Sequence, residues 1–175
     1  MFTPKTTFAA AVAAFCMFLG GSAQAAIGSH NWQVFAPEGA GFSVLMPGQP
    51  KLSTTRGKSP SGADWLDHSF LWASRDESES YTAEVCEYTG NLDVAVSIQG
   101  VRKGAIGEGK LLWEKNETMN GHPGKKVAAT DGKSVWVVEF YIATTRIYVA
   151  KYSSRNLLNA LAGAVPFLDS FQITR

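Results

Sequence analysis

Short runs of alternating apolar and polar residues dominate the chain after residue 30. Alternation with period two is typical of half-buried β-strands, because successive side chains point to opposite faces of a sheet. Turn residues separate these runs, among them Pro37-Glu38-Gly39, Asn120-Gly121 and Asp131-Gly132. The predicted strands are Asn31–Phe35, Gly41–Met46, Ala63–Ala73, Ser80–Thr89, Leu111–Met119, Lys125–Thr130, Ser134–Ala143, Arg146–Tyr152 and Gln172–Thr174.

The predicted strands differ in how far they are buried. Ser134–Ala143 is apolar on both faces, so we expect Val135–Ile142 to be the best-buried strand of a central sheet. Lys51–Gly62 is polar and rich in Ser, Thr, Gly and Lys, and we interpret it as a loop or a mobile edge segment. Ala63–Ala73 and Ser80–Thr89 form a predicted hairpin. Its facing apolar sides are Leu66, His68, Phe70 and Trp72 on the first strand and Tyr81, Ala83 and Val85 on the second.

Two segments show the spacing of an amphipathic helix. For the first, Asn91 is the predicted N-cap, and Gly104, Gly107 and Gly109 end the helix. For the second, Ser154 is the predicted N-cap, and Pro166 interrupts the helix. The apolar stripes are Val94, Ile98, Val101 and Ala105 in the first helix and Leu158, Leu161 and Val165 in the second. Strands joined by short turns, together with two helices, indicate a single α+β domain in which helices cover a mainly antiparallel sheet.

An apolar run of 12 residues, Phe8–Leu19, precedes all of these elements. Lys5 before this run and Ala23-Gln24-Ala25 after it complete the three parts of a secretory signal. The run is shorter than the roughly 20 residues that a membrane-spanning helix needs. We therefore predict a signal peptide over residues 1–25, cleaved after Ala25. We expect the remaining residues, 26–175, to form one domain that is periplasmic or secreted.

Removal of the signal peptide changes the charge and the cysteine count. Because Lys5 leaves with it, 15 of the 16 basic residues and all 15 acidic residues remain, and the formal net charge is zero. A neutral chain lacks the surplus of Lys and Arg that nucleic acids or anionic membranes attract. Cys86 is the cysteine that remains, so we expect no internal disulfide.

Two glycine-containing segments resemble known catalytic motifs only in part. Gly121–Lys126 lacks the glycine spacing and the hydroxyl residue of a phosphate-binding loop, which favours a simple turn. Gly57–Gly62 misses the G-x-S-x-G spacing of a nucleophile elbow by one position. Neither segment therefore predicts a nucleotide-binding or hydrolase site.

Cys86 and the histidines are the remaining candidates for nucleophilic chemistry. The predicted position of Cys86 inside a strand offers no helix N-terminus that would lower the pKa of its thiol. A buried structural cysteine is therefore the favoured interpretation. An enzyme with a site assembled from distant residues around Cys86 or His122, with His68 as another possible partner, stays open as the alternative.

The acidic residues and histidines show no complete metal-binding pattern. Asp64 and His68 share a predicted strand face, but zinc needs three or four ligands. The segment from Asp76 to Glu79 lacks the Asp/Asn-Gly pattern of a calcium loop. We predict no cofactor, no metal site and no catalytic residues, and leave open a carrier of a small ligand or metal.

The aromatic residues allow two interpretations. Alternation places most tryptophans on strands, where aromatic side chains fill a half-buried pleated surface, and core packing is therefore favoured over a ligand groove. The tryptophans concerned are Trp32, Trp65, Trp72, Trp113 and Trp136.

Four stretches, Gly41–Lys51, Asn120–Lys126, Asp131–Tyr152 and Phe167–Ile173, together resemble one known family. It is the family of the photosystem extrinsic protein PsbP and its bacterial PsbP-like relatives. The resemblance implies a sandwich of an antiparallel sheet with packed helices, and members that act as scaffolds or assembly factors. We therefore expect an exported, non-catalytic binding or assembly module. Its expected partner is another exported protein, and a small ligand stays open.

Overall fold

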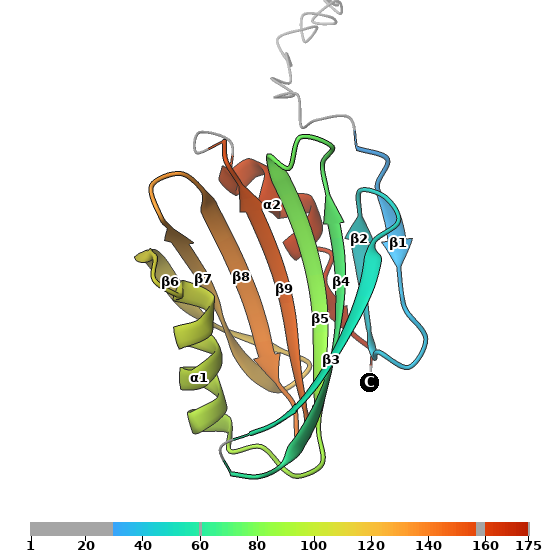
Figure 1. Ribbon diagram of the computed structural model, residues 1–175, viewed down its shortest axis with the longest axis vertical. Coiled ribbons are helices and arrows are strands. Elements are labelled where there is room, and N and C mark those ends of the chain that lie inside the picture. The colour runs from blue at the N-terminus through green and yellow to red at the C-terminus, as the bar shows by residue number, and fades with distance from the viewer. Residues whose placement is uncertain (1–29, 60, 157–159, 175) are drawn as a thin grey trace, which may run out of the picture.

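The computed structural model describes residues 30–59, 61–156 and 160–174. These residues form strands and helices in the order shown in Figure 1. The first half contains β1 (Gln33–Phe35), β2 (Phe42–Met46), β3 (Lys51–Lys58), β4 (Asp64–Ala73), β5 (Glu79–Tyr88) and α1 (Val94–Ile106). The second half contains β6 (Lys110–Met119), β7 (His122–Thr130), β8 (Val135–Ile142), β9 (Arg146–Ser154), α2 (Ala160–Leu168) and β10 (Gln172–Ile173).

The strands form two sheets in which all pairings are antiparallel. The larger sheet has seven strands in the order β3-β4-β5-β9-β8-β7-β6, and the smaller has three in the order β1-β2-β10. Short turns join most neighbours in the large sheet, whereas β5 and β9 pair across the helix and three strands that separate them in sequence. The predicted α+β fold, a mainly antiparallel sheet with two packed helices, is confirmed.

The two faces of the large sheet are covered by different elements. We call inner the face that packs against α2 and the small sheet, and outer the face on which α1 lies; in Figure 1 α1 is in front of the sheet and α2 behind it. The main core lies on the inner face and includes Tyr81, Tyr152 and Phe167. A smaller core beneath α1 contains Val138 and Phe140.

Strand β8 is buried on both faces, as its sequence predicts. Val137 and Tyr141 belong to the inner core, while Val138, Phe140 and Ile142 belong to the core beneath α1. Every residue of β8 except Trp136 is buried. The turn before it also follows the prediction, since the Asp131 carboxylate accepts hydrogen bonds from the backbone N–H groups of Lys133 and Ser134.

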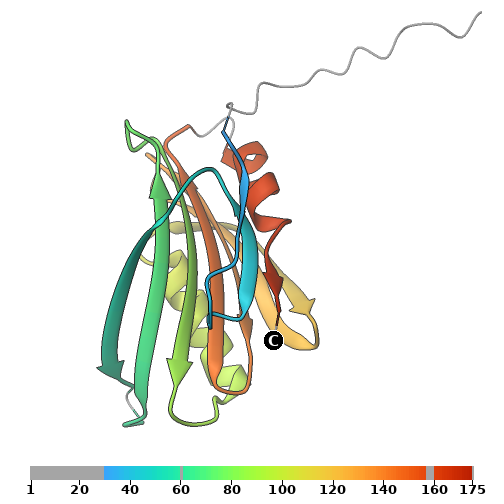
Figure 2. The same cartoon turned by 90° about the vertical axis from the view of Figure 1, so that its right-hand side faces the viewer.

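The segment predicted as a loop or mobile edge forms a regular strand at the edge of the sheet. β3 pairs with β4 without interruption from Lys51, opposite Leu71, to Lys58, opposite Asp64. Figure 2 shows β3 at the margin of the large sheet, beyond β4. Every residue of β3 except Gly57 is exposed, which explains why the sequence lacks the alternation of a half-buried strand. The prediction of an edge was right, and that of a loop was wrong.

The first helix starts two residues later than predicted. Asp93, and not Asn91, is the N-cap, and its carboxylate accepts a hydrogen bond from the Val96 N–H at 3.0 Å. Gly107 ends the helix with a φ of 59°, a conformation that glycine adopts without steric cost, whereas Gly104 lies inside the helix.

The second helix differs more from its prediction. Ser154 ends β9, and its hydroxyl accepts a hydrogen bond from the Asn156 N–H, so it does not cap α2. Pro166 lies inside the helix. The predicted stripe was also wrong at Val165, which is 52% exposed, because α2 turns Ala164, Phe167 and Leu168 to the core instead. Leu158 and the predicted signal peptide, 1–25, lie outside the described residues.

None of the helices in the described part of the chain is long and apolar enough to cross a membrane.

Candidate functional site: the open outer face

Helix α1 covers only part of the outer face. It packs against β7 and β8, and we call the remaining outer surface over β4 and β5 the open face. The strand register aligns the side chains of the open face in rows. Trp65 stands opposite Tyr88, Asp67 opposite Cys86, and Ser69 opposite Glu84. All six are partly exposed, so the open face joins aromatic, acidic and thiol groups that solvent can reach.

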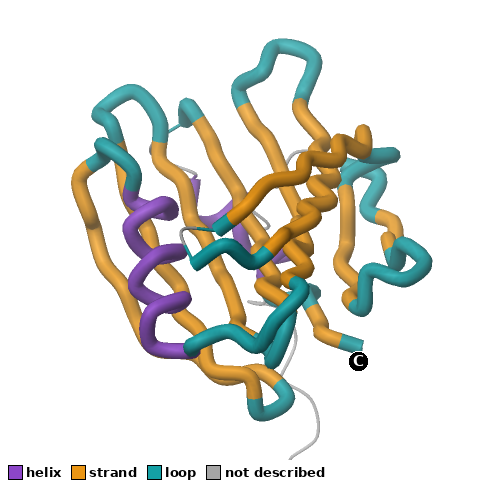
Figure 3. The backbone as a smooth tube through the Cα atoms, turned by 60° about the horizontal axis from the view of Figure 1, so that its bottom comes forward, coloured by secondary structure: helices purple, strands orange, loops and turns teal. Residues whose placement is uncertain are grey.

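A groove lies at one end of the open face, between α1 and the end of the β3–β4 hairpin. Figure 3 shows this hairpin curving over the sheet toward α1. The groove has a volume of about 700 Å³, within the range of ligand pockets. Its apolar wall includes Tyr88, Leu92, Val96, Val101 and Ile147. Its rim is polar but uncharged apart from Asp93, and includes Ser59, Ser61, Asn91 and Ser97.

Cys86 lies in β5 as predicted, with Asp67 across from it on β4 and Ile147 on β9. Burial, with a smaller contribution from the carboxylates of Asp67 and Glu84, raises the pKa of its thiol to about 11. A thiol with this pKa stays protonated at neutral pH, and the protonated form is a weak nucleophile. The surroundings of Cys86 therefore disfavour nucleophilic chemistry.

Asp67 and Glu84 form a pair of partly buried carboxyl groups on the open face. Burial raises the pKa of both, and the neighbouring Asp67 charge adds to the rise for Glu84. The Ser69 hydroxyl, which donates a hydrogen bond to Glu84 Oε1 at 3.1 Å, and the Lys151 ammonium act in the opposite direction. The pair can accept hydrogen bonds or hold a proton. The sequence does not predict it, because the two residues lie on different strands.

The structure does not bring the candidate histidines to Cys86. His68 stands opposite Val85, so it faces the inner side of the sheet while Cys86 faces the outer side. His122 begins β7, which is three strand positions from β5, a lateral separation of about 14 Å. A site that combines Cys86 with His68 or His122 is thus not assembled in this structure. An enzyme site around Cys86 or His122 with other partners stays the alternative.

Asp64 and Asp76, two of the candidate metal ligands, form an ion pair and hydrogen bonds with other residues. In the residues that the structure describes, no group of three or more His, Cys, Asp or Glu side chains is placed to hold a metal ion. Asp64 pairs with Lys58 at 2.6 Å. Asp76 accepts hydrogen bonds from Ser74 and Ser78 within its own turn, and these bonds lower its pKa to about 2.

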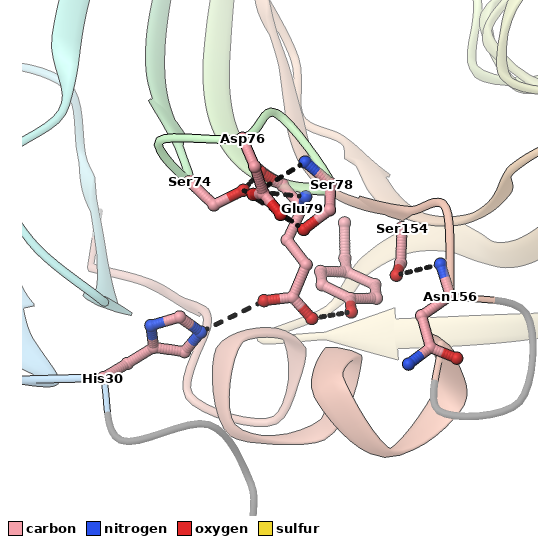
Figure 4. A network of polar contacts seen from close by, with 8 residues as sticks. His30, Ser74, Asp76, Ser78, Glu79, Ser154 and Asn156 are labelled. Carbon is pink, nitrogen blue, oxygen red and sulfur yellow. Dashed lines mark hydrogen bonds and ion pairs between the residues drawn. The ribbon is translucent and has the colours of Figure 1, made fainter.

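A polar network that the sequence does not predict joins the start of the described chain to β5 and β9 (Figure 4). Glu79 lies 3.1 Å from His30 Nε2 through one carboxylate oxygen and accepts a hydrogen bond from the Tyr152 hydroxyl at 2.9 Å through the other. The rings of Trp32, Trp72 and Tyr81 surround the His30 ring, with centroids 5.3–6.0 Å away. These contacts hold His30 against the large sheet. No local pattern could have found it, because His30 and Glu79 are 49 residues apart.

Most of the tryptophans pack in the cores, as the alternation favoured. Trp32, Trp72 and Trp113 pack against the inner core, and Trp136 packs beneath α1 and donates a hydrogen bond to the Ala105 carbonyl at 2.7 Å. Trp65 is the exception, because its indole lies over Gly57 on the open face.

Comparison with known proteins gives a likeness in structure. No protein-family model matches the chain, and no curated protein matches it. Among solved structures, the solution structure of cyanobacterial PsbP (CyanoP) from Synechocystis sp. PCC 6803 matches with a TM-score of 0.51. The match covers 90% of this chain and 98% of that chain, at 12% sequence identity. Similarity at this level identifies a fold and not an activity. The chain therefore has the PsbP-like α+β fold that its sequence resemblance implied.

Proposed function

We propose that this protein is an exported, non-catalytic binding module that acts by contact with another exported protein. The observation that carries the proposal is the exposure of β3. Among the residues that the structure describes, this strand pairs over eight residues with β4 alone and buries no side chain in either core. A strand that adds nothing to the core is available for binding a partner.

Three further features support the proposal. The Phe8–Leu19 run with its flanking residues is the sequence basis for export. The raised pKa of Cys86 disfavours a thiolate nucleophile. The resemblance to the PsbP-like family, whose members include scaffolds and assembly factors, favours a binding role over a catalytic one.

Site-specific photocrosslinking in the native cells tests both the partner and its location. A photoreactive residue at Ser53 on β3 should give a crosslinked product with another exported protein. The same residue at Thr118 on the exposed edge strand β6 is the matched control and should give none. N-terminal sequencing of the recovered protein should begin at Ala26. The proposal would be contradicted if no position on the surface gave a specific crosslinked product.

Complementation of a deletion strain separates binding from catalysis. Cys86→Ser, His122→Ala and Glu84→Gln remove the groups best suited to nucleophilic or acid–base chemistry. We expect each variant to complement fully wherever its melting temperature shows that it is folded. Loss of function in a folded Cys86→Ser or Glu84→Gln protein would replace this proposal by the enzyme alternative.

The groove beside α1 favours a second candidate function, carriage of a small apolar ligand. Gly100 lines this groove, and a Cβ added there meets no atom within 4 Å. Gly100→Leu should therefore be tolerated by the surrounding backbone and should reduce the volume of the groove. Gly104→Leu on the same helix, also in open space but outside the groove, is the control. Loss of function in the first variant alone would favour ligand carriage.

A further inference from the structure

We propose that the free edge of β3 binds an extended acidic segment of a partner protein, which joins the large sheet as an added strand. The inference rests on the proposed function, because it specifies the surface and the partner chemistry of the same binding module. In strand addition, backbone hydrogen bonds supply affinity and contacts with alternate side chains supply specificity.

Among the sheet edges of the described residues, β3 differs from the others. The edges of the small sheet, β1 and β10, are only three and two residues long. The opposite edge of the large sheet, β6, carries a register shift between Leu111 and Trp113. Short strands, bulges and charged side chains are the usual protections of an edge against pairing. β3 has neither of the first two, because all eight of its residues pair with β4 in one unbroken register. Its protection is positive charge, which opposes pairing with a basic strand but not with an acidic one.

The charge of β3 indicates the chemistry of its partner. The strand contains Lys51, Arg56 and Lys58 and no acidic residue. Within the described part of the chain, Lys58 forms an ion pair with Asp64, whereas Lys51 and Arg56 form none. The edge therefore presents positive charge beside its unpaired backbone groups, and opposite charges on neighbouring strands stabilise pairing.

The inner side of β3 adds an apolar contact. Leu52 is 59% exposed although it stands opposite Phe70, and both line a cavity of about 520 Å³ that also contacts residues 37–40. Leu52 and Arg56 lie four residues apart on the same side of the strand. A complementary segment thus carries an apolar residue and an acidic residue four positions apart, so that both point to the inner side.

A second copy of the chain fits this edge less well. Symmetric antiparallel pairing of two β3 strands about Thr54 and Thr55 would place Lys51 of each copy opposite Lys58 of the other. Like charges directly opposite each other destabilise a strand pair. The same residues that oppose self-pairing favour an acidic partner.

Binding of synthetic peptides to the purified protein tests the inference. The probes are two capped peptides of about ten residues, rich in Thr and Val, with Leu and Glu four positions apart in either order, to allow parallel and antiparallel addition. We expect one of them to bind, and Arg56→Glu to weaken that binding by about tenfold or more. Lys110→Glu, the same charge change on the β6 edge, is the matched control and should leave the affinity unchanged.

N-methylation of the peptide tests the backbone geometry without altering the protein. Methyl groups on one alternate set of amides should abolish binding, and on the other set should spare it, because only one set faces β3. Equal binding by both methylated peptides would overturn strand addition, as would no binding by either parent peptide or no effect of Arg56→Glu. Sedimentation of the free protein as a dimer, together with crosslinks from Ser53 to a second copy of the chain, would also overturn it by identifying that copy as the occupant.

These outcomes are distinguishable from failure of the proposed function. A crosslinked exported partner combined with failure of the peptide tests would overturn strand addition alone. Absence of crosslinks from every surface position would overturn the binding module itself.

Discussion

Lys126 on β7 and Glu139 on β8 form an ion pair on the inner face, with Nζ 2.9 Å from Oε2. Glu139 is only 4% exposed, and its other oxygen accepts a hydrogen bond from the Tyr141 hydroxyl at 2.5 Å. Asp169 after α2 lies 3.6 Å from the same ammonium group. Burial together with the Glu139 carboxylate raises the pKa of Tyr141. The pair therefore connects the neighbouring strands β7 and β8 to the end of α2.

Replacement of Lys126 by methionine should strongly destabilise the fold. The change leaves the Glu139 carboxylate buried without a cation, which costs about 3–5 kcal/mol. Adding Glu139→Gln should restore much of the loss, because the amide is neutral and can still accept the Tyr141 hydrogen bond. Lys115→Met is the control, since Lys115 is exposed and its ion pair with the half-buried Glu117 contributes below about 1 kcal/mol. Urea denaturation measures all four proteins; a Lys126→Met variant as stable as wild type would refute the account.

Val138→Asp should prevent folding. Val138 is buried in β8 beneath α1, and an aspartate there would place an unpaired charge in the core. Val34→Asp makes the same change at a strand position that is 75% exposed, and should be tolerated. Circular dichroism and a thermal melt distinguish the two variants. A cooperative melt for Val138→Asp would contradict the assignment of this strand to the core.

The thiol of Cys86 should make the free energy of unfolding fall as the pH rises through the alkaline range. Its pKa in the folded protein, about 11, exceeds its ordinary value of 9.0, so the folded state keeps the proton that the unfolded chain releases. This contribution to stability is present below about pH 9 and is lost as the pH rises toward 11. Cys86→Ala should decline less than wild type across this interval in urea titrations. Equal declines for the two proteins would mean that the thiol pKa is not raised.

Cys86→Ser should lower stability modestly and leave function intact. The hydroxyl enters a partly buried position that suits a small apolar group, at a cost on the order of 1 kcal/mol. Alkylation of the wild-type thiol should be slow at pH 8, and its rate should rise with a midpoint near pH 11. Rapid alkylation at neutral pH would indicate an activated thiol.

Gly124→Ala should disrupt the pairing of β7 with β8. An added Cβ at Gly124 would lie 1.9 Å from the backbone oxygen of Phe140, a distance that neither strand can relieve without moving. Gly104→Ala, in α1 and in open space, should instead stabilise the protein by roughly 0.5–1 kcal/mol, because alanine favours the helix. Chemical denaturation of both variants measures the contrast. A stable Gly124→Ala protein would show that the two strands lie further apart at this point.

The features that sequence alone determined are local ones. The alternation around Val135–Ile142 and the Asp131-Gly132 turn identified β8 and its preceding hairpin, because strand burial and turn geometry depend on residues a few positions apart. The same reasoning identified both helices and the antiparallel class of the sheet. The PsbP-like resemblance also came from sequence, since the order of several weak segments reflects the whole fold.

The tertiary structure alone decided which distant segments meet. Pairing of β5 with β9 brings Tyr152 to Glu79, and His30 reaches the same carboxylate from a third segment. β3 escaped recognition as a strand because neither of its faces is buried, so its side chains carry no alternation. A strand whose order comes from backbone pairing with a neighbour leaves little trace in its own sequence. The proposed binding edge can therefore be identified only from the tertiary structure, in which β3 pairs with β4.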